Sequence, residues 1–332
     1  MIAPGFWARE RPGAAALALA PLGALYGLAT ARRMARPGAR VQAAVICVGN
    51  FVLGGAGKTP TAIAVARILQ GLGERVAFLS RGYGGARRVD PIQVDPAIHN
   101  ARSVGDEPLL LARVAPCFVG VDRVASAREA IAQGASALVL DDGLQNPSLV
   151  KDFTFAVVDG AARFGNGLCF PAGPLRAPPA RQMRFVSAQV VLGGPPGALS
   201  ELRALAPDKP IFAAALEADA IVGATLVGRP VFAFAGIARP EKFVATLENL
   251  GARVAARRQF ADHHAYDERE IEALLAEAAA RGLTLVTTEK DHVRLAPAHR
   301  KAVLALPVTL RFETPEPVKA LLREALAARR PR

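Results

Sequence analysis

The chain has 332 residues, 52% of them hydrophobic, which is enough to bury a full core, and we expect two domains. A net charge of +12 favours anionic partners, namely phosphorylated metabolites, an acidic membrane surface or nucleic acid. The arginines are scattered and aromatic residues make up only 6% of the chain, so we expect no nucleic acid. Cys47, Cys117 and Cys169 have no CxxC spacing, which excludes the usual disulfide frameworks and zinc sites and fits a reducing cytoplasm.

The first forty residues contain an apolar stretch, 14–30, with arginines on both sides. A secretory signal has this shape, but it would export a domain that looks built for cytosolic nucleotide. A spanning helix needs about 20 apolar residues, and this stretch is shorter and is interrupted by proline and glycine. We therefore expect region 1–40 to form an interfacial helix, with Phe6, Trp7 and Tyr26 at headgroup depth. An ordinary core helix remains the alternative.

From residue 41 onward, short apolar runs alternate with helical patterns. Such repetition predicts a mostly parallel sheet with helices on both faces. Proline and glycine concentrate in Gly193–Pro210, where we place a domain boundary. The sequence thus predicts a large α/β/α domain at 41–205 and a second, smaller α/β domain at 206–332.

A glycine-rich loop, "GGAGKT", lies between the apolar strand "AVICVG" and a helical pattern, which is the context of a phosphate loop. Backbone N–H groups of its four small residues are expected to converge on phosphate oxygens: Gly54, Gly55, Ala56 and Gly57. Lys58 would reach the β- and γ-phosphates of a nucleotide, and the Thr59 hydroxyl would ligate Mg²⁺. Val52 stands where the full motif has its first glycine, so a plain strand–turn–helix remains open.

Acidic residues follow a second apolar strand, "ALVLDD", at Asp141 and Asp142. In phosphate-loop enzymes an acidic residue at the end of a neighbouring strand holds the magnesium shell. Asp106 and Glu107 open an apolar helix, where the helix dipole alone would also favour them. Arg81, in the glycine-bearing loop "SRGYGG", is a weaker candidate for facing phosphate.

The motifs, in chain order, closely resemble those of the tetraacyldisaccharide 4'-kinase family of the lipid A pathway: "VGNFVLGGAGKTP", "LSRGYGG", "VGDEP", "LVLDDGLQN", "VVDGAARFGNGLCFPAGPLR", "FAGIARPEKF", "FADHHAY" and "VTTEKD". The resemblance runs from the apolar N-terminus to about residue 314. It implies a phosphate-loop α/β/α domain joined to a second α/β/α domain. It also implies an ATP-dependent kinase that phosphorylates the 4'-hydroxyl of tetraacyldisaccharide 1-phosphate to give lipid IVA.

The resemblance assigns nucleotide and metal roles residue by residue. Lys58 and Thr59 match the family's phosphate-loop lysine and hydroxyl residue. Its magnesium-associated acids match three residues: Glu107, Asp141 and Asp142. Gln145 lies in the same motif, and we expect it among the residues that bind the nucleotide.

The resemblance also assigns the chemistry. Asp106 of "GDEP" and His263 of "DHH" match the pair implicated in activating the acceptor hydroxyl. Arg176 of "PAGPLR" and Arg81 match arginines that bear on phosphate or substrate. Two positions depart from the family pattern, since Ala177 replaces the usual glutamate and Asn146 replaces a common histidine.

The sequence therefore predicts a kinase that uses ATP and Mg²⁺, works as a monomer, and acts on an acylated disaccharide phosphate at the cytoplasmic face of the bacterial inner membrane. The main alternative is a nucleotide-driven, membrane-associated switch or partitioning ATPase, although Leu53 stands where that class has its signature lysine. A kinase of a soluble small molecule is a second alternative, against which the apolar N-terminal stretch counts.

Overall fold

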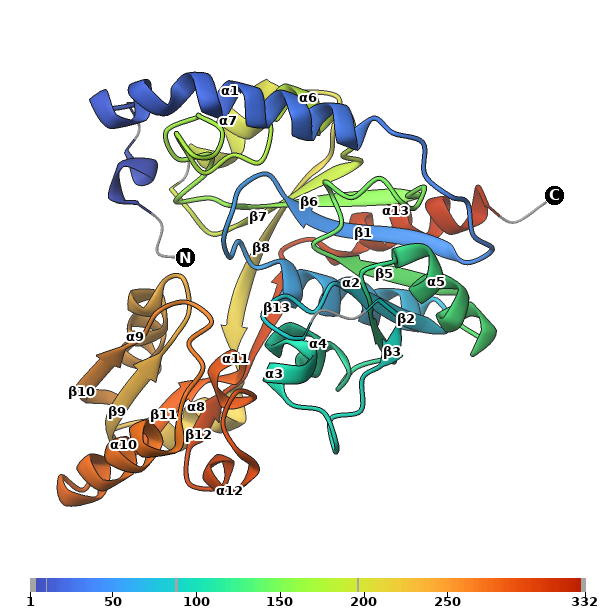
Figure 1. Cartoon of the computed structure of the whole chain (residues 1–332). Helices are drawn as coiled ribbons and strands as arrows, with labels where there is room; N and C mark the ends of the chain where they lie inside the picture. Colours follow the sequence, from blue (N-terminus) through green and yellow to red (C-terminus); the bar gives the residue numbers. More distant parts are fainter. Residues whose placement is uncertain (1–3, 10, 87–88, 196, 330–332) are drawn as a thin grey trace.

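The structure, a computed structural model, describes residues 4–9, 11–86, 89–195 and 197–329. Its strands form two sheets, one of nine strands and one of four, and helices cover both faces of each sheet (Figure 1). The α/β/α architecture expected from the sequence, with a second smaller unit, is confirmed.

The nine-stranded sheet has the order β13-β8-β7-β6-β1-β5-β2-β4-β3. Its strands are β1 (Ala44–Asn50), β2 (Val76–Ser80), β3 (Ile92–Gln93), β4 (Cys117–Val119), β5 (Ala137–Asp141), β6 (Phe153–Asp159), β7 (Ala188–Leu192), β8 (Ile211–Ala218) and β13 (Val308–Phe312). All pairs are parallel except the two at the edges, β3 with β4 and β13 with β8. The central strand β1 lies between β5 and β6, so the carboxyl ends of these three strands meet at one edge.

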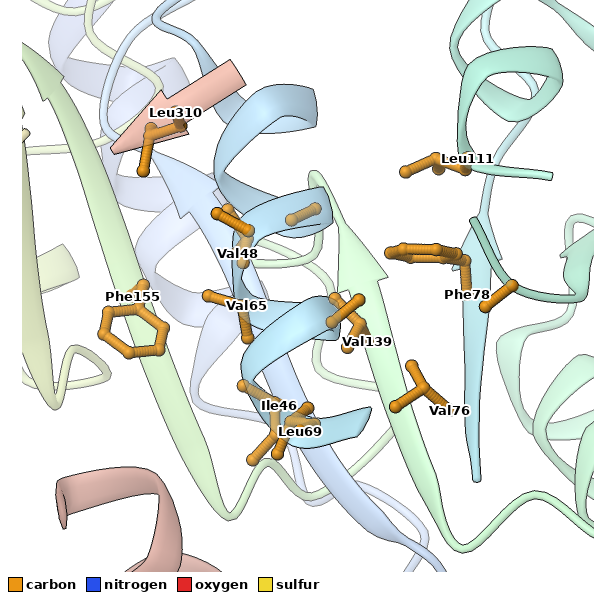
Figure 2. Packing of buried hydrophobic residues seen from close by; sticks show 14 of the residues in the cluster. Ile46, Val48, Val65, Leu69, Val76, Phe78, Leu111, Val139, Phe155 and Leu310 are labelled. Carbon is orange, nitrogen blue, oxygen red and sulfur yellow. The ribbon is translucent and has the colours of Figure 1, made fainter. Parts of the chain in front are cut away.

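Helices enclose this sheet from both sides, which explains why every residue of β1 is buried. Figure 2 shows one side, where Ile46 and Val48 of β1 pack against Val65 and Leu69 of α2. That side carries α2 (Lys58–Gly71), α4 (Asp106–Leu111) and α13 (Pro315–Ala327). The other side carries α1 (Ala14–Met34), α5 (Arg123–Ala132), α6 (Pro179–Met183) and α7 (Ala198–Leu205).

The second sheet is entirely parallel, with the order β10-β9-β11-β12. Its strands are β9 (Pro230–Ala235), β10 (Arg253–Gln259), β11 (Thr284–Thr288) and β12 (Leu304–Leu306). One face packs on α8 (Ala220–Leu226) and α9 (Pro240–Asn249), and the other on α10 (Glu268–Ala280). The remaining short helices are η1 (Gly5–Ala8), α3 (Ala101–Val104), α11 (Glu289–His292) and α12 (Pro297–Arg300).

Strand pairing divides the chain later than the boundary we expected at residue 206. The segment 193–210 contains α7 and its flanking turns, and β8 after it still pairs with β7 in the first sheet. The chain then forms the second sheet and returns, because β13 pairs with β8 and α13 packs on the first sheet. The smaller unit therefore runs from α8 to β12. Our range 206–332 was too long at both ends because it missed these long-range pairings.

Helix α1 lies along one side of the large unit (Figure 1). It is the one described helix that is long and apolar enough to cross a membrane, and 22% of its apolar window is buried. Its buried side includes Gly23 and Gly27, where an added Cβ would lie within 2.7 Å of atoms of Cys169. Trp7 does not face outward as expected, because it is only 6% exposed and its Nε1 donates a hydrogen bond to the carbonyl of Pro171.

Candidate active site

The glycine-rich loop joins the carboxyl end of β1 to the N-terminus of α2. Gly54 and Gly57 have φ angles of 98° and 83°, a region that residues with a side chain rarely adopt. A Cβ on Gly57 would also lie 2.1 Å from a methyl carbon of Leu192, which would have to move. No described side chain caps α2, which leaves its first N–H groups directed at the loop, as an anion site requires.

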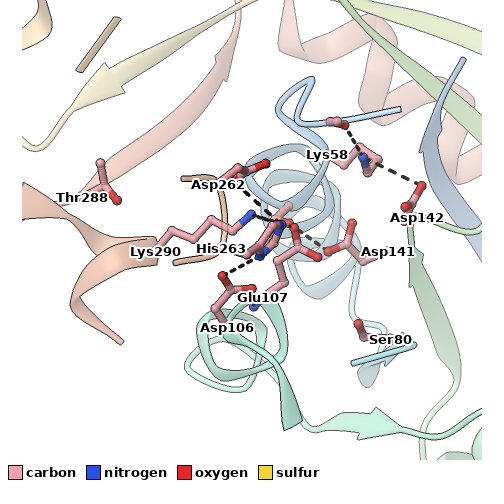
Figure 3. Close-up of polar contacts among 12 residues, drawn as sticks. Lys58, Ser80, Asp106, Glu107, Asp141, Asp142, Asp262, His263, Thr288 and Lys290 are labelled. Carbon is pink, nitrogen blue, oxygen red and sulfur yellow. Dashed lines mark hydrogen bonds and ion pairs between the residues drawn. The ribbon is translucent and has the colours of Figure 1, made fainter. Parts of the chain in front are cut away.

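The first two residues of α2 point towards the acidic pair at the end of β5 (Figure 3). The Thr59 hydroxyl donates a hydrogen bond of 2.9 Å to Asp141 Oδ2. Lys58 Nζ donates to the carbonyl of Gly54 at 3.1 Å and lies 3.9 Å from Asp142 Oδ1. The parallel pairing of β1 with β5 brings these groups together, because it aligns the carboxyl ends of the two strands.

The acidic groups fit a magnesium ion. Asp141 Oδ1 is buried and has no hydrogen-bond partner among the described residues, which is rare for a carboxylate oxygen. Burial, and then the negative charge of Glu107, raise the pKa of Asp141 to about 7. A divalent cation held by Asp141, Thr59 and their neighbours would satisfy the oxygen and neutralise the charge, and hard oxygen ligands are those that Mg²⁺ prefers.

Arg176 and Gln145 hold the residues at the start of the loop in place, and Arg176 also holds Asp142. Arg176 Nη2 donates to Asp142 Oδ2 at 2.9 Å, Nε donates to the carbonyl of Val52 at 2.9 Å, and Nη1 donates to Gln145 Oε1 at 3.1 Å. The Gln145 amide donates in turn to the carbonyl of Asn50 at 2.7 Å. Their side chains thus fix the start of the loop, and a direct contact with nucleotide stays a prediction for both.

The charge of Asp142 is set by two cations. Burial by itself would raise the pKa of Asp142, but Lys58 and Arg176 outweigh burial and hold this pKa below its usual value. Asp141 and Asp142 are therefore adjacent in sequence yet differ in proton affinity. Only Asp142 is stably ionised without a further cation.

A pair of arginines lies beside this edge of the sheet. Arg81 follows β2 and is exposed, whereas Arg123 opens α5 and is only 4% exposed. Arg123 donates to the carbonyl of Gly120, and burial followed by the charge of Arg81 lowers the pKa of Arg123 to about 10. The sequence analysis missed Arg123, although a glycine and charged residues directly after the strand "CFV" mark the same edge.

Asp106 and His263 form the expected pair between the two units. His263 Nδ1 lies 3.0 Å from Asp106 Oδ2, and Figure 3 shows the ring directed at this carboxylate. Asp106 opens α4 in the large unit, whereas His263 lies between β10 and α10 in the smaller one. His263 has a left-handed φ of 59°, and its backbone N–H donates to the carbonyl of Gly236 at 3.1 Å. The ring of Tyr83 packs edge-on at 5.2 Å from the imidazole.

Arg294 anchors this pair and was not identified from the sequence. Its Nε donates to Asp106 Oδ2 at 2.7 Å, and its Nη1 donates to Asp291 Oδ1 at 2.8 Å. Burial would raise the pKa of Asp106, but the hydrogen bond from His263 and the charges of Lys290 and Arg294 hold it well below its usual range. Asp106 is therefore a carboxylate at neutral pH.

Lys290 lies between Glu107 and His263. It lies in the "VTTEKD" motif, which resembles the family's but was assigned no residue role. Lys290 Nζ donates to Glu107 Oε1 at 3.1 Å and lies 3.3 Å from His263 Nε2. The charge of Glu107 also acts on Asp141, and Figure 3 shows Glu107, Asp141 and His263 near one another.

The two departures from the family pattern lie in the supporting structure. Ala177 is fully buried, and its carbonyl accepts a hydrogen bond of 2.5 Å from Gln182. The Asn146 side chain accepts one of 2.9 Å from the N–H of Ser148.

Comparison with known proteins places the site in a family. The family model described as tetraacyldisaccharide-1-P 4'-kinase matches residues 15–327. A protein of Methylobacterium sp. (strain 4-46) named tetraacyldisaccharide 4'-kinase is 55% identical over 329 residues, which cover 99% of this chain and 98% of the relative. A protein of Methylobacterium nodulans with the same name is 54% identical over 329 residues, covering 99% and 96%.

A solved structure shows the same fold. The crystal structure of LpxK from Aquifex aeolicus in complex with ATP superposes with a TM-score of 0.73 at 24% identity, covering 94% of this chain and 99% of that one. The extent of the family match and the identity with the named relatives both exceed what a shared fold alone would give. The chain belongs to the tetraacyldisaccharide-1-P 4'-kinase family.

Proposed function

We propose that this chain transfers the γ-phosphate of ATP to the 4'-hydroxyl of tetraacyldisaccharide 1-phosphate, giving lipid IVA. The observation that carries the proposal is the contact of 3.0 Å between Asp106 and His263, one residue from each unit, next to the phosphate loop and its acidic pair. A base, a phosphate loop and a metal-type acidic site close to one another are the components of a kinase that phosphorylates a hydroxyl group.

ATP would bind with its phosphates on the loop from Gly54 to Gly57. The backbone N–H groups of that loop and of the start of α2 donate to phosphate oxygens, and Lys58 exchanges its contact with the carbonyl of Gly54 for the β- and γ-phosphates. Arg176 keeps Asp142 in place during this exchange, and Gln145 keeps the loop's first residues fixed.

Magnesium would be held by Thr59, Asp141, Asp142 and Glu107. When bound, the ion neutralises negative charge on the phosphate oxygens of ATP. Glu107 would use its second carboxylate oxygen for the ion, because its Oε1 accepts a hydrogen bond from Lys290.

His263 would take the proton of the acceptor hydroxyl at Nε2 as the oxygen attacks the γ-phosphorus. Asp106 accepts the hydrogen bond of Nδ1 and, as a carboxylate, stabilises the imidazolium that forms. Arg294 holds Asp106 by donating to the same oxygen, Oδ2, that the imidazole contacts. Arg81 and Arg123 carry positive charge to the same edge of the sheet, which suits the phosphate of the acceptor.

Because the acceptor is a lipid, we propose that the enzyme works at a membrane surface. In this proposal α1 lies in the cytoplasmic face of the inner membrane, and the enzyme is a monomer. Four of its leucines are between 43% and 65% exposed: Leu17, Leu22, Leu25 and Leu28. A row of exposed leucines on a helix flanked by arginines is typical of an interfacial helix on anionic lipid.

The test is incubation with ATP, Mg²⁺ and tetraacyldisaccharide 1-phosphate dispersed in detergent, followed by mass analysis of the lipid. We expect one added phosphate on the acceptor and ATP consumption that depends on it. A nucleotide-driven switch would instead consume ATP with protein and membrane alone, and an unchanged lipid mass with full ATP turnover would reject the kinase proposal.

A further inference from the structure

Lys290 contacts the atom of His263 that the proposed reaction needs. It is the second residue of α11, and its side chain is 23% exposed. Its Nζ lies 3.3 Å from His263 Nε2 and donates to Glu107 Oε1 at 3.1 Å (Figure 3). A second carboxylate, that of Asp262, lies 3.9 Å from the same atom, His263 Nε2.

The hydrogen-bonding capacity of the two side chains fixes their roles. A lysine ammonium has three donors and no acceptor, so the contact of 3.3 Å requires His263 Nε2 to accept. The other ring nitrogen then carries the hydrogen, which it donates to Asp106 Oδ2 at 3.0 Å. The imidazole is neutral in this state, and its only lone pair for a proton is occupied by Lys290.

We propose that Lys290 caps the basic nitrogen of His263 until the acceptor hydroxyl displaces it, and that this cap suppresses transfer of the γ-phosphate to water. The inference rests on the proposed role of His263 as the base. It assigns Lys290 as a positioning residue that determines which hydroxyl the base can serve.

Water is the competitor because it is small and abundant. In hydrolysis the water oxygen would bond to the γ-phosphorus, the bond from that phosphorus to the bridging oxygen of ADP would break, and the proton would pass to His263 Nε2. The capping ammonium opposes this step in two ways. It occupies the place of the attacking oxygen, and its positive charge disfavours a second proton on the ring.

The acceptor can displace the cap where water does not, because binding of the whole lipid supplies the free energy for the displacement. Lys290 need not leave the site, since Glu107 already holds its ammonium at 3.1 Å and Asp262 lies on the same side. A lysine suits this exchange, because its compact charge moves on a flexible stem, whereas a guanidinium would remain in a planar, fixed contact.

The direct test compares acceptor-independent ATP hydrolysis with phosphate transfer to the lipid. Lys290→Met keeps the stem and removes the cap, so we expect the ratio of hydrolysis to transfer to rise by about tenfold or more. Lys290→Arg keeps a donor at this position, so hydrolysis should stay low, whereas the fixed guanidinium should slow transfer to the lipid. Lys209→Met is the control, because Lys209 pairs with a surface carboxylate, that of Asp208, at 3.8 Å. A Lys290→Met enzyme with the wild-type ratio would overturn the cap.

A second measurement is independent of activity. Nitrogen NMR of histidine-labelled wild-type protein should show His263 with a hydrogen on Nδ1 and a lone pair on Nε2. A hydrogen on Nε2 with a bare Nδ1 would overturn the inference, because an N–H cannot accept from an ammonium group. Absence of phosphate transfer in the wild-type enzyme would reject the proposed function, whereas normal transfer with an unchanged ratio in Lys290→Met would reject the cap alone.

Discussion

Lys58 is held between a backbone carbonyl at 3.1 Å and a carboxylate at 3.9 Å, so its ammonium is positioned before any phosphate arrives. Lys58→Ala removes the cation that offsets charge on the transferring phosphoryl group. We expect kcat to fall by about 10³-fold while the melting temperature stays near that of the wild-type protein. Lys209→Ala, at a surface ion pair, is the control. Kinase activity near the wild-type value in a folded Lys58→Ala protein would contradict the assignment of the phosphate loop.

Asp106 and His263 should act as one unit. Either single change to alanine breaks the hydrogen bond of 3.0 Å, so we expect each to lower kcat by about 10²-fold or more with little change in the KM for ATP. The kcat of the double variant should be close to that of the less active single variant, because the first change has already disabled the group that the second one removes. Steady-state kinetics of the three variants give this comparison, and fully additive losses would argue against a shared role.

The pKa of Asp141 yields a prediction for stability without metal. Its folded value of about 7 lies above the ordinary 3.8, so its contribution to stability is fully present below 3.8 and is lost as the pH rises towards 7. Asp141→Asn has no such loss. We expect the variant to melt a few °C above wild type at pH 8 in a chelating buffer, since about 1 kcal/mol shifts a melting temperature by about 2–4 °C.

The difference in melting temperature between Asp141→Asn and wild type should be smaller at pH 5, where the wild-type carboxyl is largely protonated. Added Mg²⁺ should raise the melting temperature of wild type and not that of the variant. Asp208→Asn, at an exposed position, serves as the control. An equal gain at both pH values would show that charge on Asp141 is not the cause.

At the scale of single elements, α1 is an unusual helix, because most of its buried residues are small and four of its leucines are exposed. Changing Leu17, Leu22 and Leu25 together to serine removes apolar surface without touching Gly23 or Gly27, which contact Cys169. We expect sedimentation with anionic vesicles to fall by at least about tenfold, because each leucine transferred out of water contributes about 1.5–3 kcal/mol.

The control for that experiment is Ile221→Ser, which changes an 80% exposed apolar residue on α8. It should leave vesicle binding at the wild-type value. Unchanged binding of the triple variant would mean that α1 does not contact lipid.

At the scale of the whole molecule, the two units are joined by charges on opposite sides of the phosphate loop. Besides the Asp106 and Glu107 contacts, Asp159 at the end of β6 pairs with Arg239 at 2.6 Å and with Lys242 at 2.7 Å. A Cβ on Gly55 of the loop would lie 3.9 Å from that of Ala238, so the smaller unit borders the loop directly. The two units therefore meet beside the loop, and these contacts close the gap between them there.

Replacing Arg239 and Lys242 together by methionine should weaken this closure. We expect a several-fold higher KM for ATP and a larger radius of gyration in solution scattering, because partly buried ion pairs contribute more than exposed ones. Glu217→Gln, which breaks the exposed pair with Arg311, should change neither quantity. An unchanged radius in the double methionine variant would show that these pairs do not hold the units together.

The sequence alone determined the local features. Alternating apolar runs predicted the parallel sheet, and the glycines before Lys58 predicted the loop, because φ angles of 98° and 83° need glycine whatever surrounds them. The apolar stretch with its flanking arginines predicted a helix at 14–30, and a core helix remained the alternative to an interfacial one. Asp106 and His263 were identified through motifs of a family, which contain information on distant contacts that spacing within one chain does not.

The tertiary structure decided everything that depends on pairing between distant segments. In the folded chain β13 pairs with β8, so β13 and α13 belong to the first sheet. Trp7 is buried and donates a hydrogen bond to the carbonyl of Pro171. Arg176 and Gln145 hold the residues at the start of the phosphate loop. The tertiary structure also brought Arg294 and Lys290 to within hydrogen-bond distance of residues more than 180 positions away, Asp106 and Glu107. A charged residue on a short helix looks like any solvated residue in the sequence, because the carboxylate that gives it a role is brought near only when the two units pack.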